Sequence, residues 1–230
     1  MRRRSIMLVN FTAMISACVS TTPHSVPSSA DYLRYDSGQS LPSHLGKLSN
    51  GCEFDDAPVL NSHSRKWYQK HFSAAGEKAL TAYRLDDSSR QVRFTWLRSF
   101  DAPVIVRLIR SDESAWKMDA VLLSGRGGYE PGKPEKRIKR LLSRKEGARL
   151  DDLLALNATT SHLANGCIVS LDDNGEKKIL ITADGARWIV ETLANSGYDF
   201  INVQSPDTGA VKELGLFLLE LTGWDFARIY

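Results

Sequence analysis

Hydrophobic and polar residues alternate in three consecutive segments of the chain. These segments are residues 91–98, 104–109 and 116–123. A period of two indicates β-strands, and the short polar turns between the segments favour an antiparallel meander. We expect each strand to bury one side and to expose the other, which would place Arg93 and Thr95 in solvent.

The C-terminal half contains further strand signals. Residues 186–193 and 198–203 alternate in the same way and are separated by the turn sequence Asn195-Ser196-Gly197. Such a turn between two alternating segments predicts a β-hairpin. A shorter strand is predicted at residues 177–182, after a polar, loop-like stretch at residues 157–176.

Three other segments have helical spacing. They are residues 61–76, 143–156 and 211–221. Asn61 and Gly76 suit the two ends of the first helix, and Ser143 with Glu146 forms a capping box at the start of the second. The third is apolar on nearly all sides, so we expect it to be buried. The pattern predicts an α+β domain, in which an antiparallel meander sheet of six to eight strands is packed by about three helices.

The N-terminus has the pattern of a targeting segment. Three arginines precede a short apolar run that ends at Ala17-Cys18. The run is too short to span a bilayer, and the small residues before a cysteine resemble a bacterial lipobox. The resemblance implies that Cys18 is acylated and becomes the first residue of the mature protein. An ordinary cleaved signal peptide and a short uncleaved anchor remain the alternatives.

This reading divides the chain into three parts. Residues 1–17 form the lipoprotein signal peptide, residues 18–55 a flexible tether rich in Ser, Thr and Pro, and residues 56–230 the folded domain. We expect the protein to be lipid-anchored in a bacterial cell envelope and to face the periplasm. Val19 follows the cysteine where inner-membrane retention usually needs Asp, so the outer membrane is favoured.

The charge of the mature chain argues against a nucleic-acid partner. The full sequence has 30 Lys and Arg against 27 Asp and Glu. Removal of the leader takes away three arginines and leaves the two counts equal, so no overall basic charge remains to attract a polyanion.

Three cysteines are present, and two of them remain if Cys18 carries lipid. In an oxidising periplasm we expect Cys52 and Cys167 to form a disulfide. Closing a loop of roughly 100 residues stabilises a fold by at most about 4–5 kcal/mol in the chain-entropy view. A catalytic thiol is the alternative, but no positioned base supports it.

A strongly basic segment begins after the third strand of the meander. Its central cations are Lys136, Arg137, Lys139 and Arg140. They form either an anion patch for lipid phosphates, lipopolysaccharide or cell-wall polymer, or a solvated edge strand whose charges prevent aggregation.

A glycine-rich segment, residues 125–132, connects the third strand to the basic segment. It offers either a phosphate-binding loop or, as we expect, a wide turn that needs positive φ angles.

Five residues mark a possible binding face on the strands. They are Arg187, Glu191, Arg107, Arg98 and Trp96. A concave face would make them a binding groove, and the alternative is a ladder of cross-strand ion pairs.

No sequence motif for metal, cofactor or nucleophilic catalysis appears, so we expect no cofactor, no metal and no catalytic residue. His63 and His71 are eight residues apart, which does not match the closer spacing of common metal ligands. We expect both to be surface or half-buried side chains.

Motifs in three regions resemble an uncharacterised bacterial family of secreted and lipoprotein domains of unknown function. The first is Trp67-Tyr68, and the others are Phe94-Thr95-Trp96-Leu97-Arg98 and Asp184-Gly185-Ala186-Arg187-Trp188. The family has no assigned activity, so the resemblance implies no functional residue.

The leading hypothesis is an envelope lipoprotein that binds a partner protein or an anionic envelope polymer without catalysis. A periplasmic hydrolase that uses carboxylates dispersed along the chain is the second hypothesis. An immunity-type inhibitor of an envelope-targeting toxin is the third.

Overall fold

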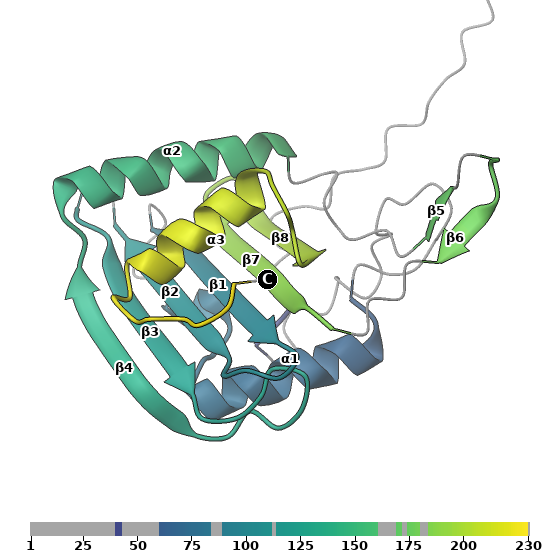
Figure 1. Ribbon diagram of the computed structural model, residues 1–230. Coiled ribbons are helices and arrows are strands. Elements are labelled where there is room, and N and C mark those ends of the chain that lie inside the picture. Colours follow the sequence, from purple (N-terminus) through teal and green to yellow (C-terminus); the bar gives the residue numbers. More distant parts are fainter. Residues whose placement is uncertain are drawn as a thin grey trace, which may run out of the picture.

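The computed structural model describes residues 40–42, 60–83, 89–111, 114–160, 169–171, 174–179 and 184–229. In this part of the chain a six-stranded antiparallel sheet lies between helices on both of its faces (Figure 1). The predicted α+β fold with about three helices is confirmed.

The sheet has the strand order β4-β3-β2-β1-β7-β8. Its strands are β1 (Arg90–Arg98), β2 (Val104–Arg110), β3 (Lys117–Leu123), β4 (Pro134–Leu141), β7 (Ala186–Ala194) and β8 (Gly197–Gln204). The first three form the predicted meander, β4 extends it at the edge, and the β7–β8 hairpin joins the free side of β1. A separate two-stranded sheet contains β5 (Val169–Leu171) and β6 (Lys177–Ile179). The sequence analysis placed β5 in a loop.

Two helices cover one face of the sheet. They are α2 (Arg144–Thr160) and α3 (Ala210–Glu220). The predicted capping box opens α2, because the Ser143 N–H donates to Glu146 Oε2 at 2.7 Å and the Glu146 N–H donates to Ser143 Oγ at 3.3 Å. Asn157 Nδ2 on α2 donates to the Ala210 carbonyl at 2.9 Å, which joins the two helices.

The helix α1 (Ser62–Ala75) covers the opposite face. Its ends are capped as predicted: the Ser64 N–H donates to Asn61 Oδ1 at 2.9 Å, and Gly76 has a left-handed φ of 74°. Because α1 covers this face, Arg93 and Thr95 are both 0% exposed. The expectation that they face solvent is therefore wrong.

Residues 40–42 pack into the domain beside α1. Leu41 is 0% exposed and belongs to the core under this helix. Arg65 donates to the Leu41 carbonyl at 3.0 Å and to the Pro42 carbonyl at 2.9 Å. The tether prediction is wrong at these three residues, because a buried leucine and two hydrogen-bonded carbonyls fix them to the fold.

The predicted signal peptide, the lipidation site Cys18 and the cysteines Cys52 and Cys167 all lie outside the described residues. None of the helices in the described ranges combines the length and the apolar character that crossing a bilayer requires.

Candidate functional site

A polar and aromatic stripe runs along the outer side of α1. It contains His63, Lys66, Trp67 and Lys70, which are spaced by three, four and seven residues from the first. This spacing places them on one side of a helix, while Tyr68 turns toward the sheet and is buried.

The loop between β3 and β4 lies opposite this stripe. Trp67 Nε1 donates to the Gly127 carbonyl at 2.8 Å, which fixes the indole ring against the loop. A side chain at position 127 would overlap the backbone of Arg98, so only glycine allows the loop to approach β1 so closely. The loop thereby forms the second wall of the site.

The same loop does not offer its backbone N–H groups to a phosphate. The Gly127 N–H donates to the Asp101 carbonyl at 3.0 Å, and the Gly128 N–H donates to the Ser99 carbonyl at 3.2 Å. Of the loop's four glycines only Gly132, with a φ of 71°, has a left-handed conformation. The expected turn is present, but most of its glycines serve close packing instead of positive φ.

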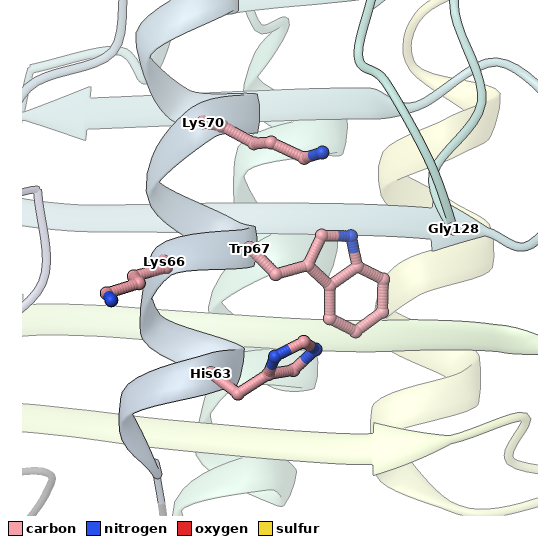
Figure 2. A pocket seen from close by; sticks show the side chains of 5 residues that line it. All are labelled: His63, Lys66, Trp67, Lys70 and Gly128. Atoms are coloured by element: carbon pink, nitrogen blue, oxygen red, sulfur yellow. The ribbon is translucent and has the colours of Figure 1, made fainter.

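Between the stripe and the loop lies a cavity of about 480 Å³, which we call the α1 cavity. It is lined by His63, Lys66, Trp67, Lys70 and Gly128. Figure 2 shows Trp67 and Lys70 projecting from α1 toward the loop, with His63 about one turn from Trp67. Lys66 is at the edge of the stripe, and its side chain points away from the loop. The described lining contains two lysines and no carboxylate.

One acidic residue stands beside the cavity. The Lys70 ammonium donates to Glu130 Oε1 at 2.7 Å, and the Glu130 side chain is exposed. The hydrogen bond and the charge of Lys70 lower the pKa of Glu130, so this carboxylate remains ionised. Lys66 makes no ion pair with any residue that the structure describes.

His71 lies beneath the cavity instead of in it. The residue is fully buried, with Nδ1 2.9 Å from the Trp67 carbonyl, so the expectation of a surface or half-buried side chain is wrong. Burial lowers the pKa of His71 despite the nearby carbonyls of Trp67 and Arg126, which favours the neutral ring. Within the described ranges no three His, Cys, Asp or Glu side chains gather as metal ligands.

Two exposed aromatic rings extend the surface beyond the cavity. Phe100 is 49% exposed and Tyr129 56% exposed, and their ring centroids lie 6.1 Å apart. Tyr129 directly follows Gly128 of the cavity lining. Large exposed aromatic side chains next to a cavity are typical of binding surfaces.

A row of charged side chains crosses the sheet under α1. We call it the charge row, and its members are successive cross-strand partners on β7, β1, β2, β3 and β4: Glu191, Arg93, Arg107, Asp119 and Lys139. Three of its members, Glu191, Arg93 and Asp119, are buried.

Arg93 forms the buried centre of the charge row. Its Nε and Nη2 donate to the two carboxylate oxygens of Glu191 at 2.6 and 2.7 Å, and both side chains are 0% exposed. Its remaining hydrogen bonds go to the carbonyls of Lys78 at 2.6 Å and Ser40 at 2.9 Å. The Tyr198 hydroxyl donates to Glu191 Oε1 at 2.8 Å, so the pair is closely surrounded by partners.

Glu77 separates two arginines that face each other across β1 and β2. Its carboxylate accepts from Arg107 Nε at 3.2 Å and lies 3.7 Å from Arg93 Nη1. Without this acid, the cross-strand contact of two cations would be destabilising. Glu77 follows the C-cap of α1, so the end of that helix neutralises the middle of the sheet.

Asp119 ends the buried part of the charge row. Arg137 donates to its two oxygens at 2.8 and 2.6 Å, and Arg107 Nη2 donates to Oδ2 at 3.1 Å. Burial alone would raise the pKa of Asp119, but the bonds and charge of Arg137, with the charges of Arg107 and Lys139, outweigh it and lower the pKa.

The predicted binding face is not a single surface. Glu191 and Arg107 are held in the charge row, and Arg187 is half-buried on the same face. Trp96 is buried on the opposite face, where the Arg98 guanidinium lies 4.2 Å from its ring centre. Glu191 and Arg107 form buried cross-strand ion pairs with Arg93 and Asp119, which agrees with the alternative for these two residues.

The predicted anion patch is an edge strand whose charges are divided between two sides. Arg137 binds Asp119, while Arg140 donates to Glu146 at 2.8 Å and to the Leu221 carbonyl at 3.1 Å. Lys136 is exposed, and Lys139 lies 3.6 Å from Asp119 on the other side of the strand. Three of the four cations thus pair with acids, which favours the edge-strand interpretation.

Comparisons of this chain with known protein families, curated proteins and solved structures gave no match. The family resemblance drawn from the sequence therefore stays a prediction, and the functional argument depends on the site itself.

The α1 cavity was not predicted, because its second wall, the loop at Gly127, meets α1 only in the folded domain. The signal was present in the spacing of His63, Lys66, Trp67 and Lys70, which gives a helix a continuous basic and aromatic side. Glu77 and Arg93 carried no comparable signal, since their partners are brought together only by the folded sheet.

Proposed function

We propose that the protein is an envelope lipoprotein, anchored through Cys18, whose domain binds a component of the cell envelope without catalysis. The observation that carries the proposal is the α1 cavity, which combines lysines, a fixed tryptophan and a neighbouring exposed aromatic pair. Cavities of this size with a few placed polar groups are common ligand sites.

The buried carboxylates support binding over hydrolysis. Glu77, Asp119 and Glu191 are each bound by at least one arginine. A general acid needs a raised pKa, whereas the pKa of Asp119 is lowered. The carboxylates of the charge row therefore suit structural ion pairs better than proton transfer.

The site is tested by photo-crosslinking in intact cells. A photoreactive amino acid replaces Lys66 at the rim of the cavity, and in a control strain it replaces Lys145, which is exposed on α2. We expect position 66 to capture an envelope component that position 145 does not capture. The same products at both positions would contradict a specific site.

The anchor is tested separately by metabolic labelling with a fatty-acid analogue. Label is expected in the wild-type chain and not in Cys18→Ala, and persistent label in the variant would remove the anchor from the proposal. Mass spectrometry without reduction should also find Cys52 joined to Cys167, while two free thiols in periplasmic material would disprove the disulfide.

A further inference from the structure

We infer that the α1 cavity binds an anionic sugar residue, one that carries a phosphate or a carboxylate group as the units of many envelope polymers do. The inference rests on the proposed function, which places the domain in the envelope, and it adds the chemical class of the ligand.

The size of the cavity fits a small, cyclic ligand. Its volume of about 480 Å³ falls within the usual range of small-molecule sites, about 300–1,000 Å³. This volume accommodates one or two sugar rings, while the remainder of a polymer would extend into solvent.

Trp67 supplies a fixed platform for such a ring. The indole N–H, which is the only hydrogen-bond donor of this side chain, donates to the Gly127 carbonyl at 2.8 Å. Behind it, Tyr68 lies 5.1 Å away and His71 6.3 Å away between ring centroids, so the indole is held from within the domain. A ligand therefore meets a preorganised aromatic surface and gains contact without the cost of ordering the side chain.

The cations around this platform favour a negative charge on the ligand. Lys66 and Lys70 both line the cavity, and the described lining contains no carboxylate. Glu130 neutralises Lys70, but its side chain is 85% exposed, so a ligand anion can take its place at low cost.

The positions of the side chains along α1 place the aromatic platform between charged or polar groups. Lys70 and His63 lie on either side of Trp67 along the helix, which is clear in Figure 2. A ring stacked on the indole would have its substituents directed toward both side chains. Stacking and charge recognition are thus combined on one helix, which favours a charged sugar over a bare anion or a neutral sugar.

The inference is tested with the full lipidated protein in nanodiscs, by isothermal titration calorimetry. The probes are tetragalacturonate, glucose 6-phosphate, glucose, inorganic phosphate and a hexaglutamate peptide. We expect at least one of the two charged sugars to bind at least about fivefold more tightly than each of the other three probes, because each of those lacks either the stacking ring or the charge. Galacturonate and glucose 6-phosphate separate a carboxylate ligand from a phosphate ligand.

Matched variants assign the two contributions. Trp67→Ala should weaken binding of the charged sugar about tenfold, and Trp67→Phe, which keeps an aromatic ring, should restore most of it. Lys66→Gln and Lys70→Gln, which keep the platform, should each weaken binding roughly two- to fivefold, with no change in Lys145→Gln. The thermal unfolding curve of each variant shows that it is folded.

The outcomes separate this inference from the proposed function. The inference is overturned if phosphate or hexaglutamate binds as tightly as the charged sugars, or if neither charged sugar binds. The proposed binding function would still hold in that case if position 66 gives a specific crosslink. The proposed function would instead be overturned if position 66 gives no specific crosslink and the wild-type chain takes up no lipid label. Sugar binding that is unchanged in Trp67→Ala and Lys66→Gln would also overturn the inference, because it would place the ligand elsewhere.

Discussion

The buried pair of Arg93 and Glu191 gives the sharpest test of the fold. Replacing Arg93 by Met keeps most of the side-chain volume and removes the charge and all of its donors. In the described part of the chain, the substitution leaves the buried Glu191 with only the Tyr198 hydroxyl as a side-chain partner. It also removes the hydrogen bonds that the Arg93 guanidinium donates to the carbonyls of Lys78 and Ser40.

The size of the effect follows from these contacts. Removing one partner of a fully buried ion pair typically costs about 3–5 kcal/mol, because the other charge stays buried without compensation. A domain of this kind has a total stability on the order of 5–15 kcal/mol. Arg93→Met should therefore lower the urea midpoint severely. Glu191→Leu should have a similar effect, because Glu77, at 3.7 Å, would be the only acid left beside Arg93 among the described residues.

The assay is urea unfolding followed by circular dichroism and tryptophan fluorescence, applied to both single variants and to Arg93→Met/Glu191→Leu. The double variant removes both charges of the pair. Its loss in free energy of unfolding should therefore be smaller than the sum of the two single losses, by about 1–3 kcal/mol. Arg90→Met is the control, because Arg90 lies on the same strand with its side chain 49% exposed and should change stability by less than about 1 kcal/mol.

Two results would refute this reasoning. If the two single losses simply add in the double variant, then the side chains do not interact energetically in the way their distances indicate. If Arg93→Met is no more harmful than Arg90→Met, the guanidinium is not buried, and α1 does not cover the sheet as described.

Three further predictions concern other parts of the fold. Gly215→Ala on α3 should destabilise the domain by about 1–3 kcal/mol despite the better helix propensity of Ala, because a Cβ would overlap the Trp188 ring; a higher urea midpoint would contradict this. Leu41→Ala should lower the free energy of unfolding by about 2–5 kcal/mol if residues 40–42 belong to the core. An unchanged urea midpoint would show that these residues belong to the tether. The hydrogen bonds of Arg140 lower the pKa of Glu146 to about 2, so this carboxylate stabilises the fold above its ordinary pKa, and the effect is lost as the pH falls toward 2. The stability difference between wild type and Glu146→Gln should shrink over that range, and a constant difference would exclude the linkage.

The fold could be predicted because its signals are local. The period of two in β1, the caps at Asn61 and Gly76, and the turn at Asn195-Ser196 depend on neighbours in the sequence. The burial of Arg93 could not be predicted in this way, since Glu191 lies 98 residues away and Glu77 reaches the sheet only after α1 has crossed it. A polar side chain in an alternating strand indicates solvent unless distant partners compensate it.

The position of α1 explains why stability and binding can be tested separately. One side of the helix buries Tyr68 and Phe72 against the sheet, and Phe72 lies 4.1 Å from the Arg93 guanidinium. The opposite side carries Lys66 and Lys70 of the cavity, which have no contact with the charge row among the described bonds and ion pairs. Substitutions in the charge row should therefore change unfolding, whereas substitutions of the two cavity lysines should change ligand affinity while the domain keeps its stability. Trp67 stands between these groups, because its carbonyl and ring contact the buried His71, and this is why the lysine variants give the cleaner measure of binding.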